Sequence, residues 1–279
     1  MLDIATLPLG WRTHLMFPRF DGQIEDRGNH LVVRTPHNPT YWWGNFLLFD
    51  KPPKPGEADD WVAAFDATIR MEQPESSHLT FGIAGGGDFE LPEDFAAAGL
   101  VKECTAILTL SRGLLDPAVP PLPRDFQIRA LELRARIGQI VELESAINAG
   151  EHPEPGYSAF REREMQRYTA MQDAGLGHWF GVFARAPKGE LLVASCGLFR
   201  EKRAAGSVSR FQDVGTHPEW RQRGLATALV HAVCRHGFEV MGDETIVIGA
   251  DPDDRAIRIY ETIGFEHEGD VYSLERPPR

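Results

Sequence analysis

With 279 residues, of which 42% are hydrophobic, the chain is long enough to bury one large core or two ordinary ones. Its formal net charge of −12 argues against a surface that binds nucleic acid, and no apolar run reaches membrane-spanning length. The N-terminus lacks the basic start and continuous apolar stretch of a signal peptide, so we expect a cytoplasmic protein with no membrane partner.

The first part of the chain alternates between strand and helix patterns. The expected elements are a strand at 43–50, a helix at 58–69, a strand at 78–83, a helix at 91–98 and a strand at 101–110. Trp42 and Trp43, next to Asn45, suit two roles. One is core packing, the default for such aromatic residues, and the other is one wall of an acceptor pocket between the two halves of the chain.

A proline-rich stretch follows at 116–124 and carries four prolines, which exclude a helix or a central strand. We predict a stiff linker there, between one domain at 1–115 and a second at 125–279. The three cysteines of the chain, Cys104, Cys196 and Cys234, are far apart and each lies in an apolar run. Their number and spacing match neither a disulfide framework nor a metal site, so we expect free thiols in a reducing compartment.

The second part of the chain predicts a longer order of elements: strand, two helices, three strands, helix, strand, helix, strand. These are expected at 125–131, 133–148, 158–173, 178–185, 191–200, 207–215, from about 223 onward, at 245–251, at 256–263 and at 271–274. The three consecutive strands are therefore 178–185, 191–200 and 207–215, and a turn at 187–189 joins the first of them to the second.

A short basic turn, Arg221–Ala226, joins the strand at 207–215 to the next helix. The first N–H groups of a helix have no intrahelical partner and carry the positive end of its dipole, so they bind phosphate oxygens wherever no side chain blocks the approach. Gly224 and Ala226 leave that approach open. The turn therefore predicts an anion-binding site; the alternative is a plain strand-to-helix turn, with glycine for packing and arginine for solubility.

A second notable segment, Asp253–Phe265, follows the strand at 245–251. Ala256 and Tyr260 fall one helical turn apart on the inward face of a helix that Gly264 can end. Tyr260 is thus either a core residue or a functional group that points into a site.

Together these two segments resemble the two signatures of the GNAT superfamily, the acyl-CoA-dependent N-acetyltransferases. Arg221–Ala226 is similar to the Arg/Gln-x-x-Gly-x-Gly/Ala motif that holds the pyrophosphate of coenzyme A, and Asp253–Phe265 to Asn-x-x-Ala-x-x-x-Tyr followed by Gly-Phe. The resemblance covers 122–279 and implies an α/β (α+β) fold with a mixed, mostly antiparallel sheet flanked by helices. Asp253 departs from the family's asparagine, and an ionised aspartate accepts but does not donate a hydrogen bond there.

The first part of the chain has the same order of elements as the end of the second part, and Ala97–Cys104 resembles Thr262–Gly269. We interpret 1–115 as a degenerate, partial GNAT-like domain in a tandem arrangement; the alternative is an unrelated small α/β domain. Its strand-to-helix turn, Lys51–Ala58, is rich in prolines, which lack the N–H donors that a pyrophosphate needs. Only the second domain is therefore expected to bind coenzyme A.

The resemblance also implies a site for acetyl-CoA as the cosubstrate. The residues expected to contact it are Val214, Thr216, Arg221, Gln222, Arg223, Gly224, Leu225, Ala226, Thr227 and Asp253. The backbone of Val214 and Thr216 would bind the pantetheine arm and the acyl oxygen. Tyr260 would be the catalytic acid that protonates the departing thiolate. No metal is expected.

The general base does not emerge from these residues. Side-chain alternation places Arg210, Gln212, Val214 and Thr216 on one strand face, and none of them is a base. Asp213 is the nearest carboxylate, but it points to the other face unless a β-bulge shifts the register. A water relay, or a carboxylate from the loop between the first two helices, stays open as an alternative.

That loop, 148–157, overhangs the substrate in the resembled family, and here it carries Glu151, His152 and Glu154. These side chains would suit a cationic acceptor, although solvated loop charges are the default interpretation. Arg210, if it faces the acceptor, would instead suit one that carries a carboxylate or a phosphate.

We therefore expect an enzyme that transfers an acetyl group from acetyl-CoA to a primary amine by direct attack. The acceptor is either a small molecule or a protein, and a homodimer is compatible with the sequence. The alternative is a non-catalytic protein that binds or senses acyl-CoA.

Overall fold

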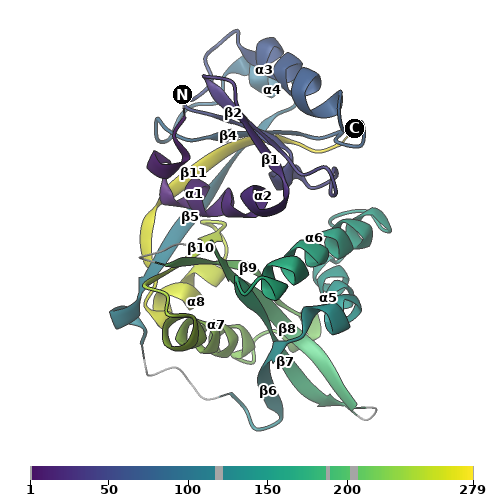
Figure 1. The fold of residues 1–279 in the computed structure, drawn as a ribbon, viewed down its shortest axis with the longest axis vertical. Coiled ribbons are helices and arrows are strands. Elements are labelled where there is room, and N and C mark those ends of the chain that lie inside the picture. Colours follow the sequence, from purple (N-terminus) through teal and green to yellow (C-terminus); the bar gives the residue numbers. More distant parts are fainter. Residues whose placement is uncertain (1, 117–121, 187–188, 202–206, 279) are drawn as a thin grey trace. The chain divides into compact units, whose positions relative to one another are not determined.

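A computed structural model describes residues 2–116, 122–186, 189–201 and 207–278. The chain forms two compact units, one from Met1–Ile107 with Gly269–Arg279 and the other from Leu108–Glu268. Figure 1 labels their elements. Residues 117–121 of the predicted linker, and 187–188 of the predicted turn, lie outside the described residues.

The N-terminal unit contains the predicted order of strand and helix. Its elements are α1 (Leu9–His14), α2 (Met16–Asp21), β1 (Gln23–Asp26), β2 (His30–Arg34), β3 (Phe46–Phe49), α3 (Ala58–Phe65), β4 (Leu79–Ile83), α4 (Glu93–Ala97) and the first part of β5 (Val101–Ser111). The order β3-α3-β4-α4-β5 is the predicted one, and the two short helices and the β1-β2 hairpin before it were not predicted.

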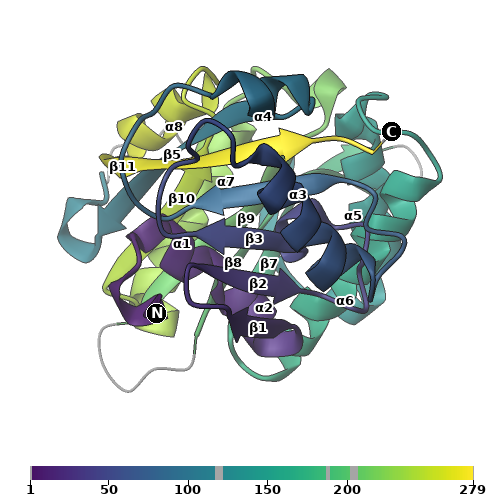
Figure 2. The same ribbon diagram turned by 90° about the horizontal axis from the view of Figure 1, so that it is seen from above.

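Strands β2, β3 and β4 of this unit are buried on both faces. Strand β3 pairs antiparallel with β2 and parallel with β4, and Figure 2 shows β1, β2 and β3 side by side. Leu47 and Phe49 pack with Trp61 and other residues of α3, while Phe46 and Leu48 join a second cluster with the residues of α1. A strand covered on both faces is a continuous apolar run, which explains the Phe-Leu-Leu-Phe sequence of β3.

The described residues of the second part of the chain have the predicted order of elements, ending in a strand that the two units share. They are β6 (Phe126–Leu131), α5 (Leu133–Asn148), α6 (Gly156–Asp173), β7 (Gly177–Ala186), β8 (Gly189–Arg200), β9 (Val208–Thr216), α7 (Leu225–His236), β10 (Thr245–Ala250), α8 (Ala256–Ile263) and β11 (Glu266–Arg276). Strands β6 to β9 pair antiparallel in sequence order, and β10 pairs parallel with β9. Helices α5 and α6 lie on one side of these strands and α7 on the other (Figure 1). The predicted α/β class, with a mixed and mostly antiparallel sheet flanked by helices, is confirmed.

The units do not follow the predicted boundaries of 1–115 and 125–279. Residues 269–279 belong to the N-terminal unit, because β11 pairs antiparallel with β4 from Tyr272 opposite Ile83 to Arg276 opposite Leu79. Conversely, the last part of β5 belongs to the C-terminal unit. Each unit thus contains a strand segment from the other part of the chain. A single boundary at the proline-rich stretch therefore does not separate the two units.

The exchanged strand should be essential to the stability of the N-terminal unit. Leu274 of β11 is fully buried in the cluster around Phe65 and Phe81. We expect Leu274→Ala to lower the free energy of unfolding of this unit by about 3 kcal/mol, because it leaves a cavity in a packed core. Met71→Ala is the matched control, since Met71 is 73% exposed in the same unit. Equal urea midpoints for the two variants would contradict this placement of β11.

Candidate functional site

The turn between β9 and α7 brings the predicted phosphate-binding residues together at the start of a helix. Helix α7 begins at Leu225, two residues later than predicted, because Gln222 and Gly224 have left-handed φ values of 61° and 73°. A residue with a left-handed φ does not continue an α-helix, so the helix begins only after Gly224. Glycine adopts such a φ value without steric cost. The turn thus presents its backbone to solvent directly before the helix.

The start of α7 fits an anionic ligand. Its first helical hydrogen bond runs from the Ala228 N–H to the Gly224 carbonyl (3.0 Å), so the N–H groups of the residues between them have no intrahelical acceptor. Among the described residues, no side chain caps this terminus. A Cβ built on Gly224 would meet no described atom within 4 Å. The backbone donors are therefore open to a phosphate.

The two arginines of the turn are held close to it. Arg221 Nε donates to the Thr216 carbonyl (3.2 Å), and the Arg223 guanidinium lies over the Trp220 ring, 4.6 Å from its centroid. Both arginines are exposed, as is Gln222. Of the other predicted contacts, Leu225 is buried in the core while Ala226 and Thr227 are half-buried. The turn presents two cations beside the open helix terminus.

Strand β9 separates from β10 just before this turn. The parallel pairing runs from Val208 opposite Thr245 to Arg210 opposite Val247 and then stops, whereas the pairing with β8 continues to Thr216. The backbone of β9 beyond Arg210 therefore faces β10 without ladder hydrogen bonds along the described strand. Val214, one of the predicted backbone contacts, lies in this segment.

A β-bulge in the same segment overturns the predicted side-chain alternation. On β8, Ser195 and Gly197 are two residues apart and share a face, but their partners on β9, Gly215 and Gln212, are three residues apart. The extra residue lies at Asp213, whose φ is 49°. Gln212 and Gly215 therefore share one face, so Val214 and Thr216 do not lie on the face of Gln212 as predicted.

Tyr260 lies on α8 with only 5% of its surface exposed. Burial raises the pKa of its hydroxyl, and the neighbouring Cys196 and Asp254 raise it further, so the group stays protonated at neutral pH. Asp253 is exposed in the preceding turn, where its N–H donates to Asp251 Oδ1 (2.9 Å). Asp254, rather than Asp253, accepts from the first N–H of α8, at 3.0 Å from Ala256 N.

A buried charge cluster on the α5/α6 side of β9 was not predicted. Arg161 of α6 is its centre and contacts Glu164, Asp213 (2.9 Å) and Glu144 (3.8 Å). The Tyr168 hydroxyl donates to Gln212 Oε1 (2.9 Å). Helical spacing is the sequence signal that points to Glu144: it lies four residues after the buried Ile140, on the inward face of α5.

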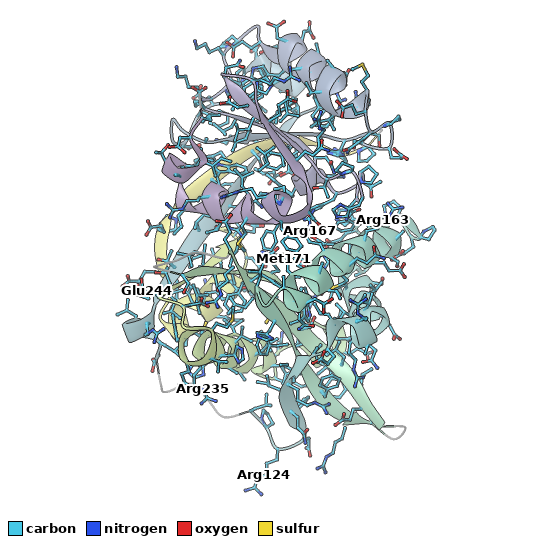
Figure 3. All side chains as sticks on the ribbon, viewed as in Figure 1. Arg124, Arg163, Arg167, Met171, Arg235 and Glu244 are labelled. Atoms are coloured by element: carbon cyan, nitrogen blue, oxygen red, sulfur yellow. The ribbon has the colours of Figure 1, made fainter. Side chains whose placement is uncertain are left out.

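The carboxyls of this cluster have unusual proton affinities. Burial, with a smaller contribution from nearby carboxylates, raises the pKa of Glu144 and of Glu164 to about 7 against the opposing effect of Arg161. Arg167, which Figure 3 labels on α6, also opposes the rise at Glu164. Both carboxyls therefore exchange protons near neutral pH, which is what general acid–base chemistry requires.

The other candidate groups have structural partners. Glu154 accepts hydrogen bonds from the Ser158 hydroxyl (2.8 Å), from the Ser158 N–H (3.1 Å) and from the Ser145 hydroxyl (3.1 Å), which lowers its pKa and secures the start of α6. His152 stacks on Tyr157, with ring centroids 5.6 Å apart, and Glu151 is exposed. The loop charges thus serve the loop itself in this structure.

The tryptophans of the N-terminal unit pack within it. Trp43 lies against Trp11, and Trp42 stacks on His78 with ring centroids 5.9 Å apart. Asn45 is fully buried and accepts a hydrogen bond from the Thr35 N–H (2.8 Å). These contacts support the packing role. The three cysteines are free thiols, as expected.

Residues 139–265 match the model of the Acetyltransferase (GNAT) family. The chain contains a GNAT acetyltransferase domain. Acyl transfer is the general chemistry that this domain indicates. The match includes the basic turn, the open terminus of α7 and Tyr260, and it confirms the family resemblance read from the sequence. A search of the curated proteins finds no match.

Solved structures resemble the whole chain, beyond the GNAT domain alone. A functionally unknown conserved protein from Staphylococcus epidermidis has a TM-score of 0.67 at 13% identity, over 93% of this chain and 96% of its own. A GCN5-related N-acetyltransferase from Kribbella flavida has a TM-score of 0.59 at 21% identity, over 95% and 93%. A tandem GNAT protein from the clavulanic acid biosynthesis pathway has a TM-score of 0.54 at 15% identity, over 83% and 74%. At these identities the similarity is one of fold. No helix among the described residues is long and apolar enough to cross a membrane.

The charge cluster of the GNAT domain should make stability depend on pH. Because the pKa of Glu144 rises from 4.5 to about 7 on folding, the folded protein holds more protons than the unfolded chain between these values. The stabilisation is present below the unfolded pKa and is lost as pH rises through the folded one. We expect the free energy of unfolding of the wild type, minus that of Glu144→Gln, to fall between about pH 5 and about pH 8, by about 1.4 kcal/mol for each unit of pKa shift.

Urea denaturation at the two pH values measures this difference. Glu142→Gln, an exposed position on the same helix, controls for the loss of one charge from α5. A difference that is the same at both pH values for Glu144→Gln would contradict the raised pKa.

Proposed function

We propose that the protein is an N-acetyltransferase that transfers an acetyl group from acetyl-CoA to a primary amine. The observation that carries the proposal is the uncapped start of α7, where Gly224 leaves the backbone donors open, directly after the segment of β9 that β10 does not pair. An anion fits the helix terminus, and an extended chain fits the unpaired edge of the strand. Acetyl-CoA has both parts, a pyrophosphate and a pantetheine arm that ends in the reactive thioester.

In this proposal the residues of the turn divide the binding between them. The N–H groups at the start of α7 hold the pyrophosphate, and the exposed guanidinium groups of Arg221 and Arg223 add charge beside it. The backbone of β9 around Val214 holds the pantetheine arm. Gln222, Leu225, Ala226 and Thr227 shape the turn, and Asp253 borders the same end of the domain.

Tyr260 is proposed to protonate the departing sulfur. Its burial keeps the hydroxyl protonated at neutral pH, and a protonated phenol is the form that can give up a proton. An amine attacks the thioester carbon, the carbon–sulfur bond breaks, and the sulfur takes the hydroxyl proton.

Only the GNAT domain is proposed to bind the coenzyme. In the N-terminal unit, the start of the corresponding helix α3 already has a carboxylate beside it: Asp94 accepts from the N–H of Ala58, the first residue of the helix, and from that of Gly56 just before it, both at 3.0 Å. A carboxylate thus stands where a phosphate would bind. This occupied terminus supports the proposal that the N-terminal unit is a degenerate GNAT-like domain without a coenzyme of its own.

The coenzyme site is tested by calorimetric titration of acetyl-CoA. We expect the wild type to bind in the micromolar range, on the order of −8 kcal/mol, and Gly224→Glu to bind roughly 100-fold more weakly. The new side chain brings its bulk and negative charge to the helix terminus. Gly242→Glu is a matched control. Gly242 also has a left-handed φ (76°), and a Cβ built on it would also meet no described atom within 4 Å. It caps the C-terminal end of the helical segment that follows α7, whereas Gly224 precedes the start of α7. Equal loss in both variants would mean that backbone strain, and not the site, weakens binding.

The role of Tyr260 is tested by Tyr260→Phe. With a panel of monoamines, diamines, amino sugars and a lysine peptide as acceptors, we expect kcat to fall about 100-fold while KM for acetyl-CoA changes little, since only the proton donor is removed. Thiol release measures the rate. Tyr272→Phe, on β11, controls for loss of a phenol hydroxyl. Tight binding of acetyl-CoA without turnover of any amine would favour the alternative, a protein that senses acyl-CoA.

A further inference from the structure

We infer that Glu144 is the proton acceptor for the attacking amine and that its cluster recognises the cationic ammonium form of the acceptor. The inference rests on the proposed function and supplies the base that the strand itself lacks. It starts from Gly215 of β9, which lies between Val214 and Thr216, the two residues whose backbone is proposed to bind the acyl end of the coenzyme.

Gly215 brings a carboxylate against this strand. A Cβ built there would lie 3.4 Å from Glu144 Oε1 and 2.5 Å from Ile147 Cδ1, so a larger residue would have to displace the end of the Ile147 side chain. The glycine therefore lets the Glu144 oxygen approach the backbone of β9. No other described carboxylate lies as close to this residue's Cβ position.

The same Glu144 oxygen lacks a hydrogen-bond partner among the described residues, although only 8% of the side chain is exposed. Ser195, which pairs with Gly215 and therefore faces the same side, is fully buried with its hydroxyl also unpartnered in the described part of the chain. Buried polar atoms normally have partners, so these two groups near Gly215 call for a hydrogen-bond partner that the described residues do not supply. A water molecule or the ammonium group of the acceptor provides one.

The charge of the cluster favours a cation at this position. The charged groups that face Glu144 are Arg161 and Glu164 from α6 and Asp213 from β9. Three carboxyl groups thus share the Arg161 guanidinium, while Arg167 acts on Glu164. An incoming ammonium group adds the missing positive charge, whereas an anionic acceptor would add to the excess of negative charge.

Glu144 is the cluster's least compensated carboxyl. Glu164 contacts both Arg161 and the Tyr168 hydroxyl (3.2 Å), and Asp213 lies 2.9 Å from Arg161. Glu144 lies 3.8 Å from that guanidinium, beyond hydrogen-bond distance. It is therefore the carboxylate of the cluster that no close ion pair holds, and its free oxygen faces Gly215.

The protons of the reaction then balance. The ammonium group gives one proton to Glu144, directly or through one water molecule, and the neutral amine forms the carbon–nitrogen bond as the carbon–sulfur bond breaks. The sulfur takes a proton from Tyr260, and the nitrogen loses its second proton to restore that hydroxyl through solvent. Glu144 returns its proton to solvent, so one proton is released per turnover.

The test is the pH profile of kcat/KM for the amine that the wild type turns over fastest. We expect the wild-type profile to fall tenfold per pH unit on the acid side of about pH 7. Glu144→Gln should lower the plateau about 100-fold or more and abolish that acid limb, and Glu144→Asp should restore part of both. Glu142→Gln, exposed on the same helix, should match the wild type. An acid limb that persists in Glu144→Gln would overturn the inference.

A second measurement covers the case in which Glu144→Gln does not fold. The carboxyl carbons of ¹³C-labelled glutamate in the wild type are titrated by NMR, with the Glu144→Asp spectrum as the assignment. A resonance that titrates near pH 7 is expected, and one that titrates below about pH 5 would overturn the inference. A wild type that binds acetyl-CoA but acetylates no amine would instead overturn the proposed function, and this role would fall with it.

Discussion

Strand β9 cannot pair along its length with both neighbours, and the site depends on this constraint. It follows β8 to its end, but its pairing with β10 stops at Arg210. The freed edge leaves backbone donors and acceptors without sheet partners, a condition that a buried strand tolerates only when another molecule or water satisfies them. The bulge at Asp213 in the same stretch turns one carboxylate toward α6 and brings a glycine, Gly215, under α5. The unpaired strand edge and the charge cluster thus have one origin, an irregular strand.

The buried cluster is a poor way to stabilise a fold and a good way to set proton affinity. Removing a guanidinium and several carboxylates from water costs more than their attraction returns unless the geometry is excellent. Arg161 pairs closely with Glu164 and Asp213 but leaves Glu144 at 3.8 Å. A domain that needed only stability would place apolar residues between α5 and β9. In the proposed reaction, the amine must lose a proton, and a buried carboxyl that exchanges protons at neutral pH can accept it. That role explains why the domain bears the desolvation cost of the cluster.

The sequence predicted what is local and missed what is assembled. The basic turn, the helix after it and Tyr260 are contiguous patterns, and they were placed correctly apart from the start of α7, which the left-handed Gln222 delays. Helices α1 and α2 are six residues each, too short for periodicity to show. The side-chain alternation of β9 was wrong because a bulge leaves no signature in the sequence. Glu144 was missed because its role depends on three elements, α5, α6 and β9, that come together only in the fold. The pairing of β11 with β4 was missed because strands can pair across any distance along the chain.

The exchange of strand segments between the two units has a consequence for how the protein is made. Leu79 of β4 pairs with Arg276 of β11, so the sheet of the N-terminal unit joins residues that lie far apart along the chain. Contacts so far apart in sequence slow folding, because the intervening chain must be ordered before they form. On the ribosome, β4 emerges long before its partner has been synthesised, and until then it presents an apolar edge, Leu-Thr-Phe-Gly-Ile, without a neighbour on that side. Most of the N-terminal unit is therefore made first, but the unit is completed only when β11 has been made.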